Sequence, residues 1–182
     1  KDSLIRPFIL ITGHRRENFD DGLNTICESV KELANKYMNF DFVYPVHLNP
    51  SVQKSVKSIL SGLNNVFLLR PLIYPDFVML MNNCKLILTD SGGIQEEAPT
   101  LGKLVLVMRD NTERSEAVDA GGSKLIGSSI DEGLVDEVSC LIDDDALFLS
   151  MQNKIETHNF HNLFGRGDSA RILCEIFDRV II

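Results

Sequence analysis

Short apolar runs that suit buried β-strands alternate along most of this chain with stretches that have the three- and four-residue apolar spacing of helices. Such alternation predicts an α/β fold with a parallel sheet, right-handed crossovers and helices on both faces, which is a Rossmann-like doubly wound arrangement. The strand-like runs occupy residues 9–12, 40–46, 66–69, 86–89, 104–107 and 124–126.

The strand pattern stops after Ile130, and only helical patterns follow. Helices are expected over residues 135–142, 147–155 and 170–181. We find no internal repeat, so residues 1–182 are expected to form one domain in which residues 144–182 are a C-terminal helical tail.

Composition narrows the class of protein. With 182 residues, 44% of them hydrophobic and 24% charged, the chain is long enough for one α/β domain with a full core. The net charge of -8 argues against a nucleic-acid partner, so a bound phosphate would be met by local cations and backbone dipoles. No apolar run approaches the roughly 20 residues that span a bilayer, and no signal-peptide pattern is present, so no membrane partner is expected.

The four cysteines, Cys27, Cys84, Cys140 and Cys174, are widely spaced and include no C-x-x-C pair, which favours a reduced, cytoplasmic protein. His158 and His161 lack metal-ligand spacing with cysteines or acids, so no metal site is expected. The chain begins at Lys1 rather than Met, with a strand almost at once, as expected of a fragment.

A glycine-rich turn joins the strand-like run at residues 86–89 to a helical pattern. Gly92 and Gly93 let the backbone turn sharply, and the following helix would present its first N–H groups to an anion. Ser91, Gly92 and Gly93 would then hold phosphate oxygens, while the carboxylate of Glu97 could accept hydrogen bonds from ribose hydroxyls. A bare strand-to-helix turn with a glycine pair is the alternative.

Polar clusters follow three of the strands, at residues 12–18, 89–99 and 112–114. In open parallel sheets this edge binds ligands. Arg114 could hold a diphosphate in bidentate fashion. Two adjacent arginines, Arg15 and Arg16, favour a neutral imidazole at His14 that could take or donate a proton. The alternatives are that His14 caps the strand end and that the arginines form a solvated face.

Four motifs in this order, at residues 13–18, 43–50, 88–99 and 109–114, resemble the non-hydrolysing UDP-N-acetylglucosamine 2-epimerases over nearly the whole chain. The resemblance implies the C-terminal domain of a GT-B fold, whose N-terminal domain would belong to the same polypeptide. It implies an isomerase of polysaccharide biosynthesis, homodimeric at full length, that converts UDP-N-acetylglucosamine to UDP-N-acetylmannosamine by elimination and re-addition of UDP. No cofactor is implied.

The resemblance also implies site residues. His14 matches an active-site histidine, Leu72 and Phe77 match uracil contacts, and Arg15, Arg16 and His47 match a possible regulatory site; Ser91, Gly92, Gly93, Glu97 and Arg114 match UDP contacts. The chain has Leu72 where the family commonly has glutamine, and Ser115 where proline is usual. From periodicity alone Phe77 is a core side chain, and a structural role for His47 is equally open.

Other functions stay open from the residues alone. The same phosphate-binding turn would suit a hydrolysing relative, a retaining glycosyltransferase or an epimerase of a related UDP-sugar such as a 2,3-diacetamido uronic acid. It would also suit a free-standing UDP-sugar-binding module. About 200 upstream residues forming a second nucleotide-fold domain would favour an enzyme over a binding module.

Overall fold

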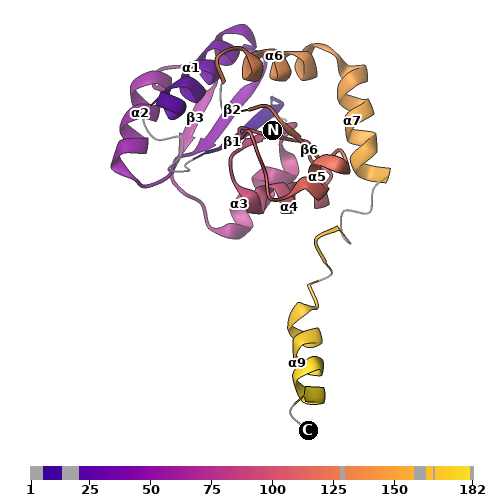
Figure 1. Ribbon diagram of the computed structural model, residues 1–182. Coiled ribbons are helices and arrows are strands. Elements are labelled where there is room, and N and C mark those ends of the chain that lie inside the picture. The colour runs from indigo at the N-terminus through magenta and orange to yellow at the C-terminus, as the bar shows by residue number, and fades with distance from the viewer. Residues whose placement is uncertain (1–5, 14–20, 128–129, 158–162, 166, 181–182) are drawn as a thin grey trace, which may run out of the picture.

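The computed structural model of the chain describes residues 6–13, 21–127, 130–157, 163–165 and 167–180. Six strands form one parallel sheet in the order β3-β2-β1-β4-β5-β6 (Figure 1). All six strand predictions are confirmed to within two residues at either end. The strands are β1 (Phe8–Thr12), β2 (Asp41–Pro45), β3 (Val66–Leu69), β4 (Leu86–Thr89), β5 (Val105–Val107) and β6 (Ser123–Leu125).

The strand order reverses between β1 and β4, which are neighbours in space although two strands separate them in the chain. The carboxyl ends of these two strands are level, because Thr12 pairs with Thr89 in the parallel register. The buried hydroxyls of the two threonines lie 2.6 Å apart and share a hydrogen bond. In open α/β sheets the crevice at such a reversal is the place where ligands bind.

Helices cover both faces of the sheet. Successive residues of β1 point to opposite sides, so that Ile9 and Ile11 join one apolar cluster while Phe8 and Leu10 join the other. The first cluster also holds α1 (Asp21–Lys36), α2 (Pro50–Leu60), α6 (Ile130–Asp143) and α7 (Asp145–Thr157), and the second holds α3 (Tyr74–Asn83) and α4 (Gly92–Thr100); the short α5 (Ser115–Asp119) joins β5 to β6. The predicted doubly wound, Rossmann-like fold is confirmed.

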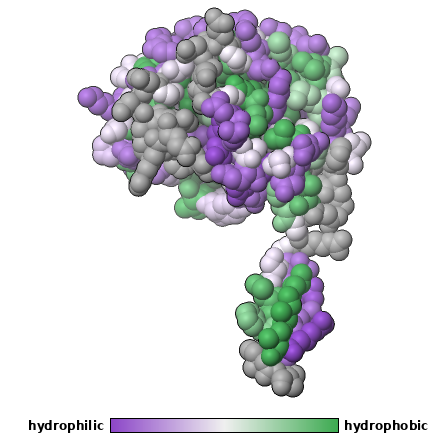
Figure 2. Space-filling model, viewed as in Figure 1, coloured by the Kyte–Doolittle hydropathy of each residue, from purple (hydrophilic) through white to green (hydrophobic). Residues whose placement is uncertain are grey.

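The helices after residue 144 differ in their packing. Phe148 and Ile155 place α7 on the first cluster, whereas α9 (Ser169–Val180) extends away from the sheet and has no buried residue (Figure 1). Figure 2 shows the apolar side chains of α9 gathered on one side of the helix. That stripe consists of Ile172, Leu173, Ile176, Phe177 and Val180, which are 42–74% exposed. Among the helices that the structure describes, none combines the length and the apolar character that crossing a membrane would require.

Candidate functional site

The N-terminus of α4 lies just beyond the carboxyl end of β4. Ser91 is the N-cap residue, with extended backbone (φ −83°, ψ 130°), and no side chain caps the first turn. The Ser91 N–H donates to Oγ1 of Thr89 at 3.0 Å, which sets the direction in which the chain enters the helix. The first amides of α4 therefore present a partial positive charge at the strand-order reversal, as an anion site requires.

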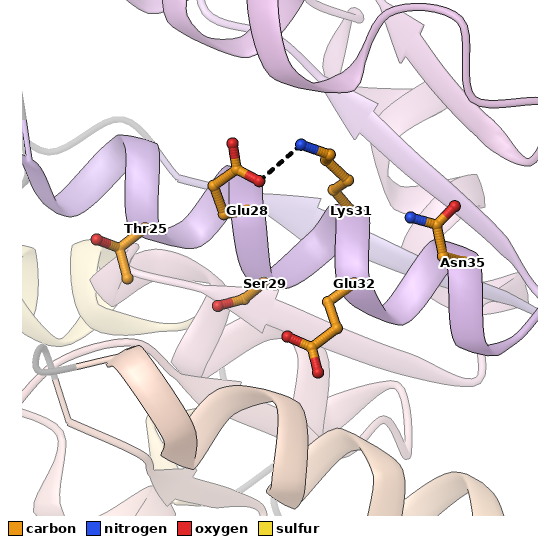
Figure 3. A pocket seen from close by; sticks show the side chains of 6 residues that line it. All are labelled: Thr25, Glu28, Ser29, Lys31, Glu32 and Asn35. Carbon is orange, nitrogen blue, oxygen red and sulfur yellow. Dashed lines mark hydrogen bonds and ion pairs between the residues drawn. The ribbon is translucent and has the colours of Figure 1, made fainter.

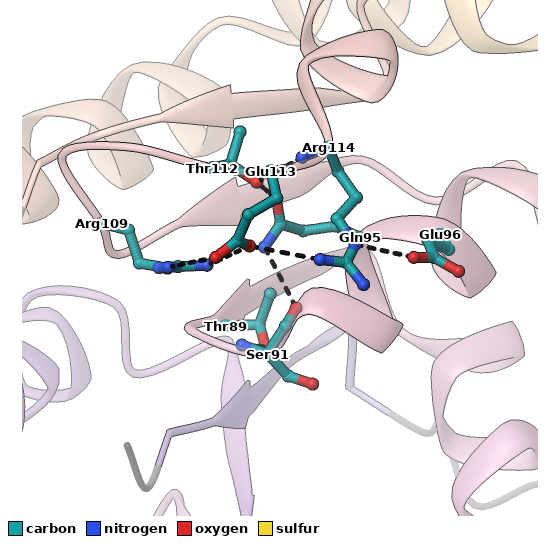
Figure 4. Close-up of polar contacts among 8 residues, drawn as sticks. All are labelled: Thr89, Ser91, Gln95, Glu96, Arg109, Thr112, Glu113 and Arg114. Atoms are coloured by element: carbon teal, nitrogen blue, oxygen red, sulfur yellow. Dashed lines mark hydrogen bonds and ion pairs between the residues drawn. The ribbon is translucent and has the colours of Figure 1, made fainter. Parts of the chain in front are cut away.

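The guanidinium of Arg114 lies directly over Gly92. A Cβ atom at position 92 would lie 3.1 Å from Cζ of Arg114, so any other residue there would push the guanidinium back by a few tenths of an ångström. Nε of Arg114 donates to Glu96 at 2.7 Å, and Nη1 donates to Glu113 at 3.2 Å (Figure 4). The hydrogen bond to Glu96 raises the pKa of Arg114 above its already high usual value, so the cation persists at any physiological pH.

A second arginine, Arg109, supports this arrangement from just beyond the end of β5. Both terminal nitrogens of Arg109, whose side chain is only 13% exposed, donate to the carboxylate of Glu113, at 3.3 and 3.4 Å. Glu113 thus bridges Arg109 and Arg114 (Figure 4). Arg109 and the carboxylates of Glu96 and Glu113 together hold the Arg114 guanidinium above the helix N-terminus.

Gln95 is a functional candidate that sequence reasoning missed. Its side chain is fully buried, and its Nε2 donates to the Ser91 carbonyl at 3.2 Å. Its Oε1 accepts from the Thr112 hydroxyl, which in turn accepts the Arg114 N–H at 3.1 Å (Figure 4). This chain of hydrogen bonds joins the cap of α4 to the loop that carries Arg114. A polar residue on the buried side of a short helix was the available signal.

Glu97 lies one helical turn beyond Gly93, on the same face. Its Oε1 would lie 3.8 Å from a Cβ atom at position 93, so this oxygen lies beside the first turn of α4. Its Oε2 accepts a 2.6 Å hydrogen bond from the hydroxyl of Tyr74, the first residue of α3. That hydrogen bond raises the pKa of the Tyr74 phenol, which therefore stays protonated as a donor.

Leu72 and Phe77, which the sequence placed at a uracil site, lie in and after the segment that joins β3 to α3. Both side chains are half-buried. Phe77 packs against the second apolar cluster, beside β1, β4 and β5. The Phe77 ring therefore contributes to the apolar core. Contact with the base stays a prediction for both Leu72 and Phe77.

The predicted regulatory residues are only partly described. His47 is exposed beyond the end of β2, two strand positions from β4, and its Nδ1 accepts the Asn49 N–H at 3.1 Å. His14, Arg15 and Arg16 lie outside the described residues. Roles for these four residues stay predictions.

Gly13, the last described residue before His14, is held from β2. The hydroxyl of Tyr44, a fully buried side chain, donates to the Gly13 carbonyl at 2.8 Å. Burial raises the pKa of Tyr44 well above its usual value, so the phenol remains a donor. In the sequence, Tyr44 lies in a predicted strand and in the motif at residues 43–50, but neither indicated its hydrogen bond to Gly13.

Two hollows lie away from the α4 N-terminus. One, of about 400 Å³, is lined by six side chains of α1 alone, with Glu28 and Lys31 on one side and Glu32 on the other (Figure 3). The other, of about 510 Å³, lies at the ends of β2 and β3, between Val46, Lys57 and Arg70. Neither is lined by a predicted UDP residue. Within the described part of the chain, no group of three or more His, Cys, Asp or Glu side chains is placed to hold a metal ion.

The chain is similar to known proteins over almost its whole length. Residues 2–178 match the family described as UDP-N-acetylglucosamine 2-epimerase. The chain is 51% identical over 168 residues to a probable UDP-N-acetylglucosamine 2-epimerase of Ralstonia nicotianae, covering 92% of this chain and 43% of that protein. It is 50% identical over 162 residues to the UDP-N-acetylglucosamine 2-epimerase of Yersinia pestis, covering 89% of this chain and 41% of that protein.

Among solved structures, a crystal structure of UDP-GlcNAc 2-epimerase from Neisseria meningitidis, described as bound to UDP-GlcNAc, superposes with a TM-score of 0.86 and 46% identity. The superposition covers 95% of this chain and 45% of that one. The chain thus spans less than half the length of the relatives it matches. Sequence and fold together place the chain in the UDP-N-acetylglucosamine 2-epimerase family.

Proposed function

We propose that this chain is the nucleotide-binding, C-terminal half of a UDP-N-acetylglucosamine 2-epimerase, an isomerase that interconverts UDP-GlcNAc and UDP-ManNAc. The observation that carries the proposal is the convergence of an uncapped helix N-terminus, the Arg114 guanidinium over Gly92 and the Glu97 carboxylate beside Gly93. The helix amides and the Arg114 guanidinium would bind a diphosphate, and the Glu97 carboxylate would accept hydrogen bonds from ribose hydroxyls. Family membership and the UDP-GlcNAc bound to the Neisseria relative support the same ligand.

In the proposed reaction, the C2 proton is removed and UDP leaves C1, which gives a sugar with a C1–C2 double bond. C2 is then reprotonated on its other face as UDP adds back at C1. Negative charge grows on the diphosphate as the anomeric bond breaks. The amides of α4 and Arg114 would stabilise that charge, and because Glu96 and Glu113 already hold the guanidinium, little reorganisation is needed. His14 is proposed to act at the same diphosphate, and the carboxylates that move the C2 proton are proposed to belong to the rest of the protein.

The remaining site assignments form part of the same proposal. Uracil would contact Leu72, in the segment between β3 and α3, and Phe77, in α3. Arg15, Arg16 and His47 would form a separate regulatory site. Each assignment rests on the resemblance of the motifs to those of the family.

The proposed organisation of the full protein follows from the length of the relatives. Residues 1–182 would form one UDP-sugar-binding domain with residues 144–182 as its tail. A further domain of the same polypeptide would face the nucleotide site, and the two domains would form a cleft between them. The exposed apolar stripe of α9 supports such a partner, because an amphipathic helix gains stability when its apolar face is covered. A homodimer is proposed from the resemblance alone.

A cytoplasmic location is proposed from the cysteines. All four are free thiols, and burial raises the pKa of both Cys27 and Cys84 to about 12, so these two are unreactive. Free thiols are usual in reducing compartments.

Calorimetry with UDP tests the nucleotide site. We expect the chain to bind UDP, and Arg114→Ala to weaken binding about 10- to 100-fold, the effect of one or two lost charge-assisted hydrogen bonds. Arg171→Ala is the matched control, because Arg171 also pairs with two carboxylates, those of Asp168 and Glu175, but lies on α9. Absence of UDP binding, or equal losses in the two variants, would contradict the proposal.

The epimerase activity needs the full-length protein. NMR should show UDP-ManNAc forming from UDP-GlcNAc with the full-length protein and not with the 182-residue chain, because half of a cleft cannot hold the sugar against its catalytic groups. Turnover by the isolated chain would overturn the placement of the proton-transfer groups outside it.

A further inference from the structure

Tyr74 and Glu97, which are 23 residues apart in the sequence, form a hydrogen bond between two helices. Tyr74 begins α3 and Glu97 lies in the second turn of α4, so the bond joins the segment after β3 to the helix after β4. The phenol is 64% exposed and packs in neither apolar cluster. Its described polar contact is therefore with the carboxylate that we propose for ribose binding.

The geometry assigns the two carboxylate oxygens of Glu97 different tasks. Oε2 is 2.6 Å from the Tyr74 hydroxyl, while Oε1 lies on the side of Gly93, beside the first turn of α4. A carboxylate on a flexible glutamate side chain samples several rotamers, and a charge-assisted hydrogen bond to one oxygen restricts them. With Oε2 held, Oε1 is the acceptor that faces the proposed nucleotide site.

We infer that Tyr74 is a positioning residue that holds Glu97 so that the site selects nucleotides with intact ribose hydroxyls. The inference rests on the proposed UDP site and adds a residue to it. A neutral phenol suits this task because it can donate to the carboxylate without neutralising it. A lysine or arginine in its place would pair with Glu97 and weaken it as an acceptor for neutral hydroxyls.

The position of Tyr74 keeps this task separate from folding. Pro75 follows it in the first turn of α3, where the fixed φ of proline is compatible with the helix, and the ring lies at the surface. Removing the hydroxyl alone therefore leaves the packing of α3, which buries Met81 in the second cluster, unchanged.

The test compares UDP with 2′,3′-dideoxy-UDP by calorimetry on the 182-residue chain and its Tyr74→Phe, Glu97→Gln and double variants. The wild type should prefer UDP. Tyr74→Phe should weaken UDP about three- to tenfold, the effect of one misplaced hydrogen bond to a charged acceptor, and leave the affinity for the dideoxy nucleotide unchanged. In the Glu97→Gln background, Tyr74→Phe should add no further loss, because both changes act on one interaction.

Tyr37→Phe is the matched control. The Tyr37 hydroxyl donates to the Asp143 carboxylate at 2.7 Å, between α1 and α6 on the opposite face of the sheet. This variant should keep the wild-type preference for UDP. A change in preference in Tyr74→Phe and not in Tyr37→Phe supports the inference.

The outcomes separate the two proposals. If the wild type prefers UDP and Tyr74→Phe keeps that preference, or loses both nucleotides equally, the role of Tyr74 is overturned while the UDP site stands. If the wild type binds neither nucleotide, the proposed UDP site is overturned, and the inference falls with it.

Discussion

Gly92 has a steric role that its backbone angles do not reveal. It has ordinary helical geometry, so no positive φ demands glycine there. The demand comes from Arg114, whose Cζ would lie 3.1 Å from a Cβ atom at that position. Gly93 differs, because its nearest neighbour would be Oε1 of Glu97 at 3.8 Å, which is an ordinary contact.

Gly92→Ala therefore separates stability from binding. Alanine favours a helix interior by about 0.5–1 kcal/mol, and moving the Arg114 guanidinium opposes that gain, so urea denaturation should show little change in stability. The displaced guanidinium should weaken UDP binding about tenfold, the effect of one lost charge-assisted hydrogen bond. Gly133→Ala is the control, because Gly133 also lies in a helix, α6, and a Cβ atom there would make an ordinary 3.5 Å contact with the Ile126 carbonyl. Equal losses of UDP affinity in both variants would show that Arg114 does not act from above Gly92.

At the scale of elements, Asn65 joins the end of α1 to the sheet. It is 1% exposed, and its side-chain amide donates to the carbonyls of Ala34, Tyr37 and Phe40 at 3.0, 3.2 and 3.0 Å. Its own carbonyl accepts the Phe42 N–H at 2.8 Å, in β2. One residue thus supplies donors to three carbonyls around the loop between α1 and β2, and it helps to place β2, the strand that leads to His47.

Asn65→Ala should lower the free energy of unfolding by about 2 kcal/mol, because buried carbonyls lose their donor. Urea denaturation of the chain measures this change. Asn83→Ala is the matched control: its amide also donates to a carbonyl, that of Met79 at 2.7 Å, but at an exposed position where water can replace it. If Asn65→Ala lowers the free energy of unfolding no more than Asn83→Ala does, other donors replace the three hydrogen bonds.

At the scale of the whole molecule, the sheet with its two helical layers and the isolated α9 differ in what they bury. The two apolar clusters contain buried residues of β1, β2, β4 and β5, and partly buried residues of β3 and β6, such as Leu68 and Leu125, pack against them. In contrast, no residue of α9 is buried. The folded body that carries the candidate site is therefore independent of α9.

Deleting residues 168–182 should leave the thermal midpoint and the UDP affinity of the chain unchanged, because none of the residues of α9, Ser169–Val180, is buried. Differential scanning calorimetry and a UDP titration measure the two quantities. The matched deletion of residues 144–182 also removes Phe148 and Ile155 from the first cluster and should lower the midpoint. A lower midpoint after the shorter deletion would contradict the packing described for α9.

The strands and most helices could be predicted because their signals are local. The apolar runs around Ile9, Ile87 and Leu106 and the helical spacing from Leu23 to Leu33 record burial directly in the sequence. Alternation of the two patterns then restricts the topology to a parallel sheet with its ligand edge at the strand ends. Ser91, Gly92 and Gly93 were predicted at that edge for the same local reason.

The partners of the charged side chains could not be predicted, because they depend on which elements the fold brings together. Arg114 meets Glu96 and Glu97 meets Tyr74 only because β4 lies beside β1 and β5, and α3 and α4 cover the same face. Gln95 and Tyr44 read locally as ordinary helix and strand residues. By itself the sequence determined the elements, the sheet edge and the glycine turn, whereas the tertiary structure decided which side chains hold Arg114 and Glu97, since hydrogen bonds across elements form only once the sheet is assembled.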